Sequence, residues 1–202
     1  GLRVEATASG SGALERDGYR VANLEMPWSG RRDYDVDVGA AENEVETALA
    51  KLRESGAAKV FVAGHSQGGL FALVFGGTHR VDGIVAIAPG GNVAAPTFRD
   101  KLGEAVEHAR QLVAEGKGQE KARLSDFESS RGVYPVITTP AAYLTWFDPD
   151  GAMNQPRAMQ AIKADTPVLF IAPTRDYPGL ARVKQEMFGL LAKHPLTKMA
   201  EP

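Results

Sequence analysis

The sequence contains no cysteine, and this absence excludes disulfide bonds, thiolate metal sites and a cysteine nucleophile. It also lacks the run of roughly 18 apolar residues that a membrane-spanning helix needs, and its first residues do not follow the basic and then apolar pattern of a secretion signal. We therefore expect no membrane partner. The compartment stays open, because Gly1 is not an initiator methionine.

Charge of one sign is scarce as well, since 23 basic and 25 acidic side chains give a formal net charge of −2. The longest basic run is the pair Arg31 and Arg32. Nucleic acids are bound through dense positive charge, so we expect no nucleic-acid partner. With 44% hydrophobic and 24% charged residues the composition is that of a globular protein, and the length of 202 residues favours one domain over two.

Short apolar segments alternate with helical patterns, which is typical of βα units around a mostly parallel sheet. Five strands are expected, the last weaker than the others, at residues 19–24, 59–63, 83–88, 166–172 and 196–200. Two helices are expected beside the second strand, over residues 41–52 and 67–75. The serine and glycine at 55–56 would end the first helix, and the glycine pair at 76–77 the second. The pattern predicts an α/β fold with helices on both faces of the sheet.

The interval from Gly90 to Asp165 interrupts this alternation, because it contains no convincing strand. Apolar residues spaced for one face of a helix recur over residues 102–113. Thr139 followed by Pro140 is typical of a helix start. We therefore predict one domain over residues 1–202, in which residues 90–165 form a helical, cap-like insertion.

The segment that carries chemistry is Gly64-His65-Ser66-Gln67-Gly68, a G-x-S-x-G motif between a predicted strand and an apolar helix. At such a turn a serine is strained with its Oγ exposed, while side chains at Gly64 and Gly68 would collide with the neighbouring strand and helix. The backbone N–H of Gln67 would face the oxyanion that forms when Ser66 attacks an acyl carbonyl. The alternative is a glycine-rich turn that grips a phosphate at a helix N-terminus in an unrelated doubly wound protein.

Several segments together resemble the α/β-hydrolase superfamily, in particular small bacterial serine esterases and lipases with a G-H-S-x-G motif. These segments are residues 18–21 leading toward 26–28, the elbow at 64–69, residues 83–88 ending in 89–90, and residues 166–171 before 174–176. The resemblance implies an α/β-hydrolase fold and cleavage of a carboxylic ester through an acyl-enzyme on Ser66. It implies neither a cofactor nor a metal.

The resemblance also implies a catalytic acid and a base. In the superfamily the acid follows a late strand, which points to Asp176, whereas Asp148 and Asp150 are better interpreted as turn formers in Asp-Pro and Asp-Gly pairs. His194 is the only histidine after Asp176 and is the candidate base. The superfamily's histidine follows the last strand, at about the point where this chain stops at Pro202. His194 is therefore alternatively a residue at a helix C-terminus that faces the helix dipole.

Two further residues are candidates for substrate binding. Trp28 follows a predicted strand at the edge where open α/β sheets bind ligands, and it either lines the pocket or packs in the core. His65 is expected near the strand ends with its side chain pointing away from the Oγ of Ser66. The aromatic residues within 143–147 form either an apolar lid or the insertion's own small core. The alternating carboxylates at 33–37 are expected to be solvated rather than to bind a cation.

Both ends of the chain look short beside the superfamily, so we expect either a piece of a longer hydrolase or a minimal variant without the usual base. The leading hypothesis is a serine hydrolase that acts on a small-molecule ester. The alternative is a catalytically impaired α/β-hydrolase-like protein that binds a ligand or partner in the same pocket. A sheet edge left exposed by a shortened N-terminus would favour a homodimer.

Overall fold

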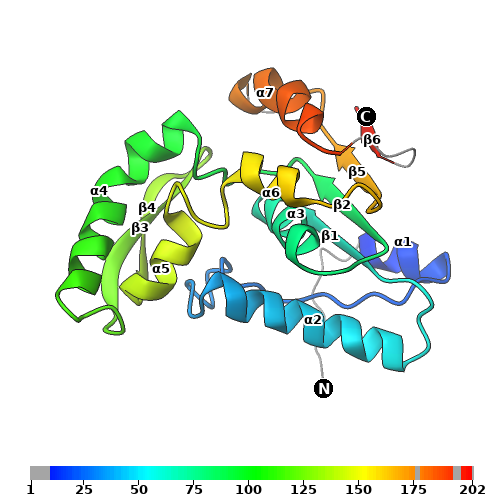
Figure 1. Cartoon of the computed structure of the whole chain (residues 1–202), viewed down its shortest axis with the longest axis horizontal. Coiled ribbons are helices and arrows are strands. Elements are labelled where there is room, and N and C mark those ends of the chain that lie inside the picture. The colour runs from blue at the N-terminus through cyan, green and yellow to red at the C-terminus, as the bar shows by residue number, and fades with distance from the viewer. Residues whose placement is uncertain (1–9, 176–177, 193–196, 202) are drawn as a thin grey trace.

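The computed structural model describes residues 10–175, 178–192 and 197–201, in which helices and strands alternate (Figure 1). The helices are α1 (Gly10–Arg16), α2 (Val38–Glu54), α3 (Gln67–Thr78), α4 (Pro96–Ala114), α5 (Pro140–Phe147), α6 (Gln155–Ala161) and α7 (Pro178–Gly189). The strands are β1 (Phe61–His65), β2 (Gly83–Ile87), β3 (Ala122–Glu128), β4 (Gly132–Thr138), β5 (Val168–Ile171) and β6 (Lys198–Ala200).

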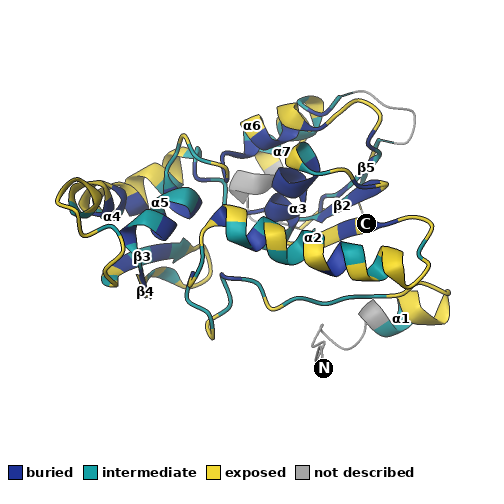
Figure 2. Ribbon diagram, turned by 60° about the horizontal axis from the view of Figure 1, so that its bottom comes forward, coloured by how far each residue is buried: buried dark blue, intermediate teal, exposed yellow. Residues whose placement is uncertain are grey.

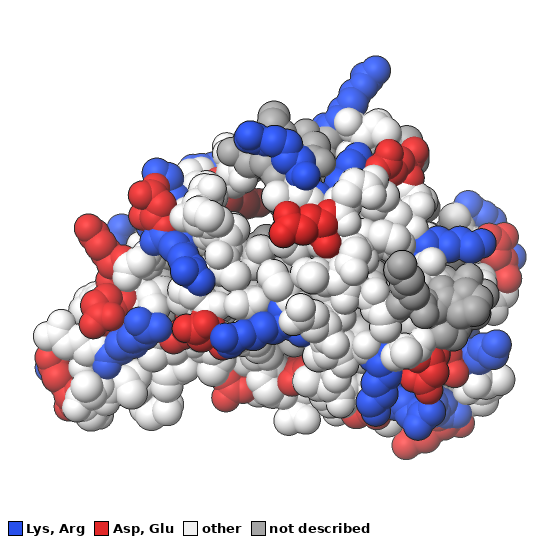
Figure 3. All heavy atoms as spheres, turned by 45° about the horizontal axis from the view of Figure 1, so that its top comes forward, with Lys and Arg blue, Asp and Glu red and all other residues white. Residues whose placement is uncertain are grey.

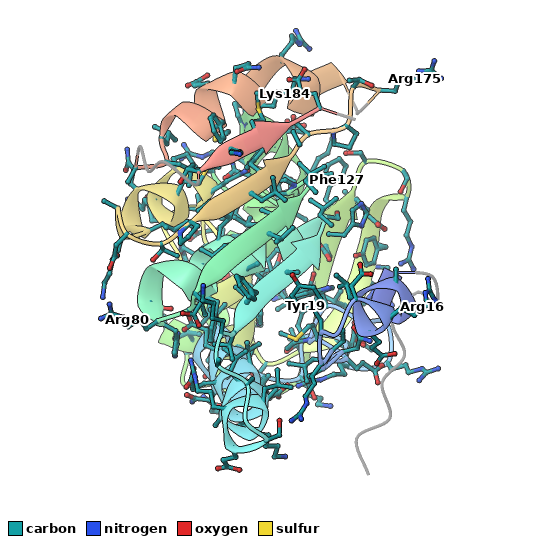
Figure 4. The ribbon with its side chains drawn as sticks, turned by 90° about the vertical axis from the view of Figure 1, so that its right-hand side faces the viewer. Arg16, Tyr19, Arg80, Phe127, Arg175 and Lys184 are labelled. Carbon is teal, nitrogen blue, oxygen red and sulfur yellow. The ribbon has the colours of Figure 1, made fainter. Side chains whose placement is uncertain are left out.

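The main sheet consists of β1, β2, β5 and β6 in that order, all parallel, and the four strands lie side by side in Figure 4. Parallel neighbours need a crossover connection, which α3 supplies between β1 and β2. The carboxyl ends of the strands are level, because His65 pairs with Ile87 and Ile87 pairs with Ile171. The residues that follow these strands therefore gather at one edge of the sheet. The predicted α/β fold is confirmed.

The core beside this sheet is built from the apolar faces of α2, α3 and α6. Its large buried members are Leu49, Val62, Leu73, Phe75, Ile84, Met159, Val168 and Phe170. The helix α3 is apolar nearly all round, as the sequence predicts, and every residue from Gly69 to Gly76 is buried. Figure 2 shows α3 mostly buried, whereas α2 is buried along one side only.

The prediction that Gly76 and Gly77 end the helix after the elbow is wrong, because α3 continues to Thr78. A Cβ on Gly76 would lie 2.1 Å from the Cδ1 of Ile84, and a Cβ on Gly77 would lie 3.1 Å from the Cβ of Ala161. The two glycines therefore allow α3 to approach β2 and α6 closely. In the sequence this packing role cannot be distinguished from a helix stop.

Residues 19–24 run extended but pair with no described strand, so the expected first strand is not formed there. Among the described strands β1 is consequently at an edge, and Phe61 at its start is 47% exposed. A cavity of about 1270 Å³ lies between β1, residues 18–26 and parts of α2 and α3. Alternating apolar residues indicate a local preference for extended backbone, whereas a strand also needs a neighbouring strand to pair with. The predicted homodimer would form through such an edge, and the oligomeric state stays a prediction.

The insertion is not purely helical, because the antiparallel hairpin β3–β4 lies between α4 and α5, with Asp126 opposite Tyr134. The prediction of an interval without strands is wrong at this point. Charged residues are frequent in β3 and Pro135 interrupts β4, which hides both strands from a search for apolar runs. A proline is tolerated here because a two-stranded sheet consists of edges. The predicted helix start at Thr139 and Pro140 is confirmed.

The elements α4, β3, β4 and α5 stand together at one end of the molecule (Figure 1). A second core cluster joins them to α3 and to the residues before α2. Its members include Tyr34, Leu70, Phe71, Leu102, Val106, Leu124, Val136, Tyr143, Trp146 and Phe147. The aromatic residues within 143–147 are thus core residues, and Tyr143, Trp146 and Phe147 are at most 3% exposed. The insertion packs on the elbow helix through this cluster.

None of the helices in the described ranges is long and apolar enough to cross a membrane. Acidic and basic side chains are interspersed over the face that Figure 3 presents. On that face no broad area of one sign is available to bind an oppositely charged polymer.

Candidate active site

Ser66 stands at the turn between β1 and α3 in a strained backbone conformation, with φ 54° and ψ −123°. Residues other than glycine rarely adopt a positive φ, and such strain costs about 1–3 kcal/mol. Ser66 is exposed, and its side chain forms no capping hydrogen bond with α3. The turn therefore has the geometry that the G-x-S-x-G motif predicts, with a free hydroxyl presented at a sharp corner.

The glycines of the motif contribute unequally to this turn. A Cβ on Gly64 would lie 2.1 Å from the carbonyl oxygen of Gly68, a distance that no side chain tolerates. A Cβ on Gly69 would lie 3.0 Å from the carbonyl oxygen of Ile87. A Cβ on Gly68 itself would meet only Trp28, at an ordinary 3.5 Å. The expected collision is thus found at Gly64 but not at Gly68, whose backbone is what Gly64 approaches.

The loop that follows β2 holds the elbow from one side. The N–H of Ser66 donates to the carbonyl of Ile87 at 2.9 Å, and the N–H of Gly90 donates to the carbonyl of Ser66 at 3.0 Å. Within the same loop Ala88 also has a positive φ, of 43°. These hydrogen bonds offset part of the strain at Ser66 and fix the direction of its side chain.

Gln67 is the first residue of α3, where backbone N–H groups have no partner within the helix. The N-terminal end of a helix also carries a partial positive charge, so an anion next to Ser66 would be stabilised there. The role predicted for the N–H of Gln67 as an oxyanion donor is compatible with this position. The same end of α3 would also suit a phosphate, which is the alternative raised by the sequence.

The side chain of Gln67 belongs to a buried hydrogen-bond network that the sequence does not predict. The hydroxyl of Tyr34 lies 2.5 Å from Oδ2 of Asp126, and it lies 3.1 Å from Nε2 and 3.2 Å from Oε1 of Gln67. A phenol has one proton and an ionised carboxylate can only accept, so the hydroxyl donates to Asp126. Gln67 then donates its amide N–H to Tyr34. The residue after Ser66 is thereby linked to strand β3 of the insertion.

Asp126 is the centre of this network, and it is only 3% exposed. Its Oδ2 also accepts from the hydroxyl of Tyr134 at 2.6 Å, and its Oδ1 accepts from the N–H of Phe127 at 2.6 Å. Burial raises the pKa of Asp126, and the hydrogen bonds from the two tyrosines oppose that rise. Burial and the neighbouring carboxylate raise the pKa of Tyr34 well above its usual value. The signal in the sequence is an aspartate on the apolar side of an alternating strand.

Three histidines lie in the described ranges, and none of them is hydrogen-bonded to Ser66. His65 is exposed at the end of β1 and lines the cavity beside it. His79 stacks on Phe75 with ring centroids 4.2 Å apart, and its Nδ1 lies 2.9 Å from the hydroxyl of Thr78. His108 is exposed on α4.

The predicted acid Asp176 and the candidate base His194 lie outside the described residues. The alternative acids Asp148 and Asp150 form the turn that the sequence predicts, in which Oδ1 of Asp148 accepts from the N–H of Asp150 at 2.9 Å. The other oxygen of Asp148 pairs with Arg110 at 2.9 Å. These contacts give Asp148 and Asp150 local structural roles, so the catalytic assignments of Asp176 and His194 stay predictions.

Trp28 lies against Gly68 in the first turn of α3, and Gly68 follows Ser66 by two residues. Its ring is 5.3 Å from that of Phe71 and 5.9 Å from that of Trp146, measured between centroids. Trp28 and His65 both line the 1270 Å³ cavity, whereas Ser66 does not. Packing and pocket lining, the two alternatives for Trp28, therefore occur together. The cavity extends along the edge of β1, beside Ser66.

The alternating carboxylates at 33–37 have structural partners. Asp35 pairs with Arg32 at 3.0 Å, and Asp37 caps α2 by accepting from the N–H of Ala40 at 2.7 Å. Over the described ranges no group of three or more acidic, histidine or cysteine residues could hold a metal ion.

Comparison with protein families identifies the class of this chain. Residues 10–199 match the model of the alpha/beta hydrolase family. The chain therefore belongs to the α/β-hydrolase family, and the fold predicted from the G-H-S-Q-G segment and its neighbours is confirmed. No curated protein sequence matches the chain significantly.

Solved structures agree on the fold. The chain is similar to a monoacylglycerol lipase of Paleococcus ferrophilus, with a TM-score of 0.65 and 21% identity over 100% of this chain and 81% of the lipase. It is also similar to a structure from a study of the metagenome-derived lipolytic enzymes LipS and LipT, with a TM-score of 0.59 and 16% identity over 95% of this chain and 75% of the other. A third similar structure is a thermostable carboxyl esterase of Bacillus coagulans, with a TM-score of 0.53 and 15% identity over 83% of this chain and 64% of the esterase.

Proposed function

We propose that this protein is a serine hydrolase that cleaves carboxylic esters through an acyl-enzyme on Ser66. The observation that carries the proposal is the exposed hydroxyl of Ser66, held at positive φ between β1 and the N-terminus of α3. The similarity in fold to a monoacylglycerol lipase and a carboxyl esterase supports esters as the substrate class. The bond cleaved in such an ester joins the acyl carbon to the alkoxy oxygen.

The reaction proceeds in two steps. In the first, Oγ of Ser66 forms a bond to the acyl carbon, its proton passes to a base, and the alcohol leaves with a proton returned from that base. In the second, water gives a proton to the base as its oxygen forms a bond to the acyl carbon. The bond between that carbon and Oγ then breaks, and Oγ takes the proton back from the base. In both tetrahedral intermediates the N–H of Gln67 donates to the oxyanion. His194 is the proposed base and Asp176 orients it, while Trp28 and His65 contact the substrate from the side of β1.

The test is hydrolysis of p-nitrophenyl esters of increasing acyl length by the wild-type chain and by Ser66→Ala. A Ser55→Ala variant serves as a matched control, because the hydroxyl of Ser55 only bonds the carbonyl of Leu52 at the end of α2. We expect release of p-nitrophenol by the wild type and by Ser55→Ala, and loss of at least about 1,000-fold in Ser66→Ala. Equal rates in all three proteins would overturn the proposal.

A second candidate function is ligand binding without turnover. It is favoured by the finding that none of the three described histidines is hydrogen-bonded to Ser66, since removal of a triad member leaves only the acceleration due to binding and the oxyanion hole. Under this hypothesis the esters would bind and protect the protein against thermal unfolding, but Ser66→Ala would not change the rate of ester hydrolysis.

A further inference from the structure

The loop before α2 contains a second strained turn, at Asp33 and Tyr34. Both residues have positive φ, of 52° and 56°, although neither is glycine. Strain of this kind persists only where the surroundings hold it. Here the N–H of Ile137 donates to Oδ2 of Asp33 at 2.6 Å, and the hydroxyl of Thr138 donates to the carbonyl of Tyr34 at 2.5 Å. Because Ile137 and Thr138 belong to β4, the insertion hairpin holds this turn.

The side chain of Tyr34 is held by the same hairpin. It is 2% exposed and packs against the rings of Trp146 and Phe147, with centroids 5.7 Å and 4.9 Å away. Its hydroxyl donates to Asp126 on β3. Because the carboxylate only accepts, the proton of Tyr34 points at Asp126 and its lone pairs face Gln67. Asp126 thus fixes the orientation of the Tyr34 hydroxyl, and with it the direction in which the hydroxyl oxygen accepts a hydrogen bond.

The acceptor of Tyr34 meets the elbow at Gln67, directly after the strained Ser66. Two turns with positive φ, one at residues 33–34 and one at residue 66, are therefore joined by a single hydrogen bond between side chains. Ser66 is also restrained by main-chain hydrogen bonds, with Ile87 and Gly90 at the end of β2 and in the loop after it, and with Gly69 and Leu70 in α3. The Tyr34 link connects the elbow to Asp126 of the insertion by hydrogen bonds, in addition to the apolar packing of the insertion on α3.

We propose that Tyr34 and Asp126 are positioning residues that hold Gln67, and with it the strained Ser66, in the reactive conformation. The reactivity of the serine would then depend on a hairpin about 60 residues further along the chain. The proposal rests on the proposed function in so far as the reaction at Ser66 is used to measure it. Neither residue touches the reacting atoms, so their effect is on the rate of reaction and not on the identity of the nucleophile.

The chain offers a matched control in Tyr143. Like Tyr34 it is a buried tyrosine of the same cluster, and its hydroxyl donates to the carbonyl of Ser125 at 2.7 Å without contact to Gln67. Tyr34→Phe and Tyr143→Phe each remove one buried hydroxyl. Tyr34→Phe takes one of two hydroxyl donors from Asp126 and the acceptor from Gln67, whereas Tyr143→Phe takes a donor from the carbonyl of Ser125. Both should lower stability. Only Tyr34→Phe removes the link to the elbow.

The experiment measures the rate at which a fluorophosphonate labels Ser66 in the wild type, Tyr34→Phe, Tyr143→Phe and Gln67→Met. We expect Tyr34→Phe and Gln67→Met each to slow labelling about tenfold, the double variant to be no slower than either, and Tyr143→Phe to stay within about twofold of the wild type. Asp126→Asn, which keeps one oxygen acceptor, should recover part of the rate lost in Asp126→Leu. Equal slowing in Tyr34→Phe and Tyr143→Phe, or none in either, would overturn the proposal.

A second readout does not depend on the reaction. Urea unfolding of Tyr34→Phe, Gln67→Met and the double variant gives the coupling between the two side chains. A wild type that is not labelled at all would overturn the proposed function, and the unfolding cycle then decides the positioning claim. Non-additive losses of unfolding free energy would support an interaction that positions Gln67 through Tyr34, and additive losses would overturn it.

Discussion

Gly90 lies directly against Ser66, since a Cβ at the position of Gly90 would be 3.4 Å from the Oγ of Ser66. Gly90→Ala therefore adds a methyl group beside the hydroxyl without a clash in the backbone, and Gly90 does not have a positive φ. We expect this methyl group to slow labelling of Ser66 about tenfold with little change in the unfolding midpoint. Gly103→Ala, on the open surface of α4, is the control and should label at the wild-type rate. An unchanged rate in Gly90→Ala would contradict the placement of Oγ.

The two glycines of the elbow motif should respond differently to alanine. Gly64→Ala places a Cβ 2.1 Å from the backbone of Gly68, so β1 and α3 must move apart. We expect loss of at least about 3 kcal/mol of stability, or no folded protein. Gly68→Ala meets only Trp28 at 3.5 Å and gains helix propensity, so its stability should be unchanged or higher. Circular dichroism melting of both variants checks this, and similar midpoints would contradict the close approach.

The raised pKa of Asp126 predicts a pH dependence of stability. Because burial raises the folded-state pKa above the unfolded value, the folded state retains, at pH values between the two, a proton that the unfolded chain has lost; above the folded-state pKa the carboxylate is ionised in both states. The contribution of Asp126 is therefore present at acid pH and declines as the pH rises toward the folded-state pKa. Glu128 adds to the rise, whereas Tyr34, Tyr134 and the N–H of Phe127 oppose it.

The measurement is the free energy of unfolding of the wild type minus that of Asp126→Asn, from about pH 4 to pH 8. We expect this difference to fall as the pH rises and to level off above the folded-state pKa. A difference that rises with pH would show that the tyrosine hydrogen bonds outweigh burial.

The assignment of the acid can be tested against its rivals. Asp148→Asn should leave labelling within about twofold of the wild type, because Asp148 holds a turn and pairs with Arg110. Asp176→Asn should slow labelling at least about 100-fold if Asp176 orients the base. The opposite order would show that Asp148 and not Asp176 serves the nucleophile.

Much of the fold follows from local patterns in the sequence. The strands β1, β2 and β5 are continuous apolar runs, and the motif at 64–68 requires a strand before it and a helix after it. Two of the failures share one cause, which is that the decisive partner lies outside the segment that carries the pattern. Residues 19–24 have the pattern of a strand without a described neighbour, and Gly76 mimics a helix stop because Ile84, in the next strand, needs its space.

The candidate site divides in the same way. The strained position of Ser66 and the place of Gln67 at a helix N-terminus are properties of one short segment, so the motif predicts them. The network of Tyr34, Asp126 and Gln67 joins three segments that only the folded chain brings together. A single aspartate in β3 indicates that a buried partner exists but does not identify it.

The most direct test of the central claim is intact-mass spectrometry before and after incubation with a fluorophosphonate, with Ser66→Ala alongside. In the labelling reaction Oγ forms a bond to phosphorus, fluoride leaves, and the serine proton is released. We predict one adduct, equal to the probe minus hydrogen fluoride, on the wild type and none on Ser66→Ala. Absence of an adduct on the wild type, or the same adduct on Ser66→Ala, would contradict an activated nucleophile at Ser66.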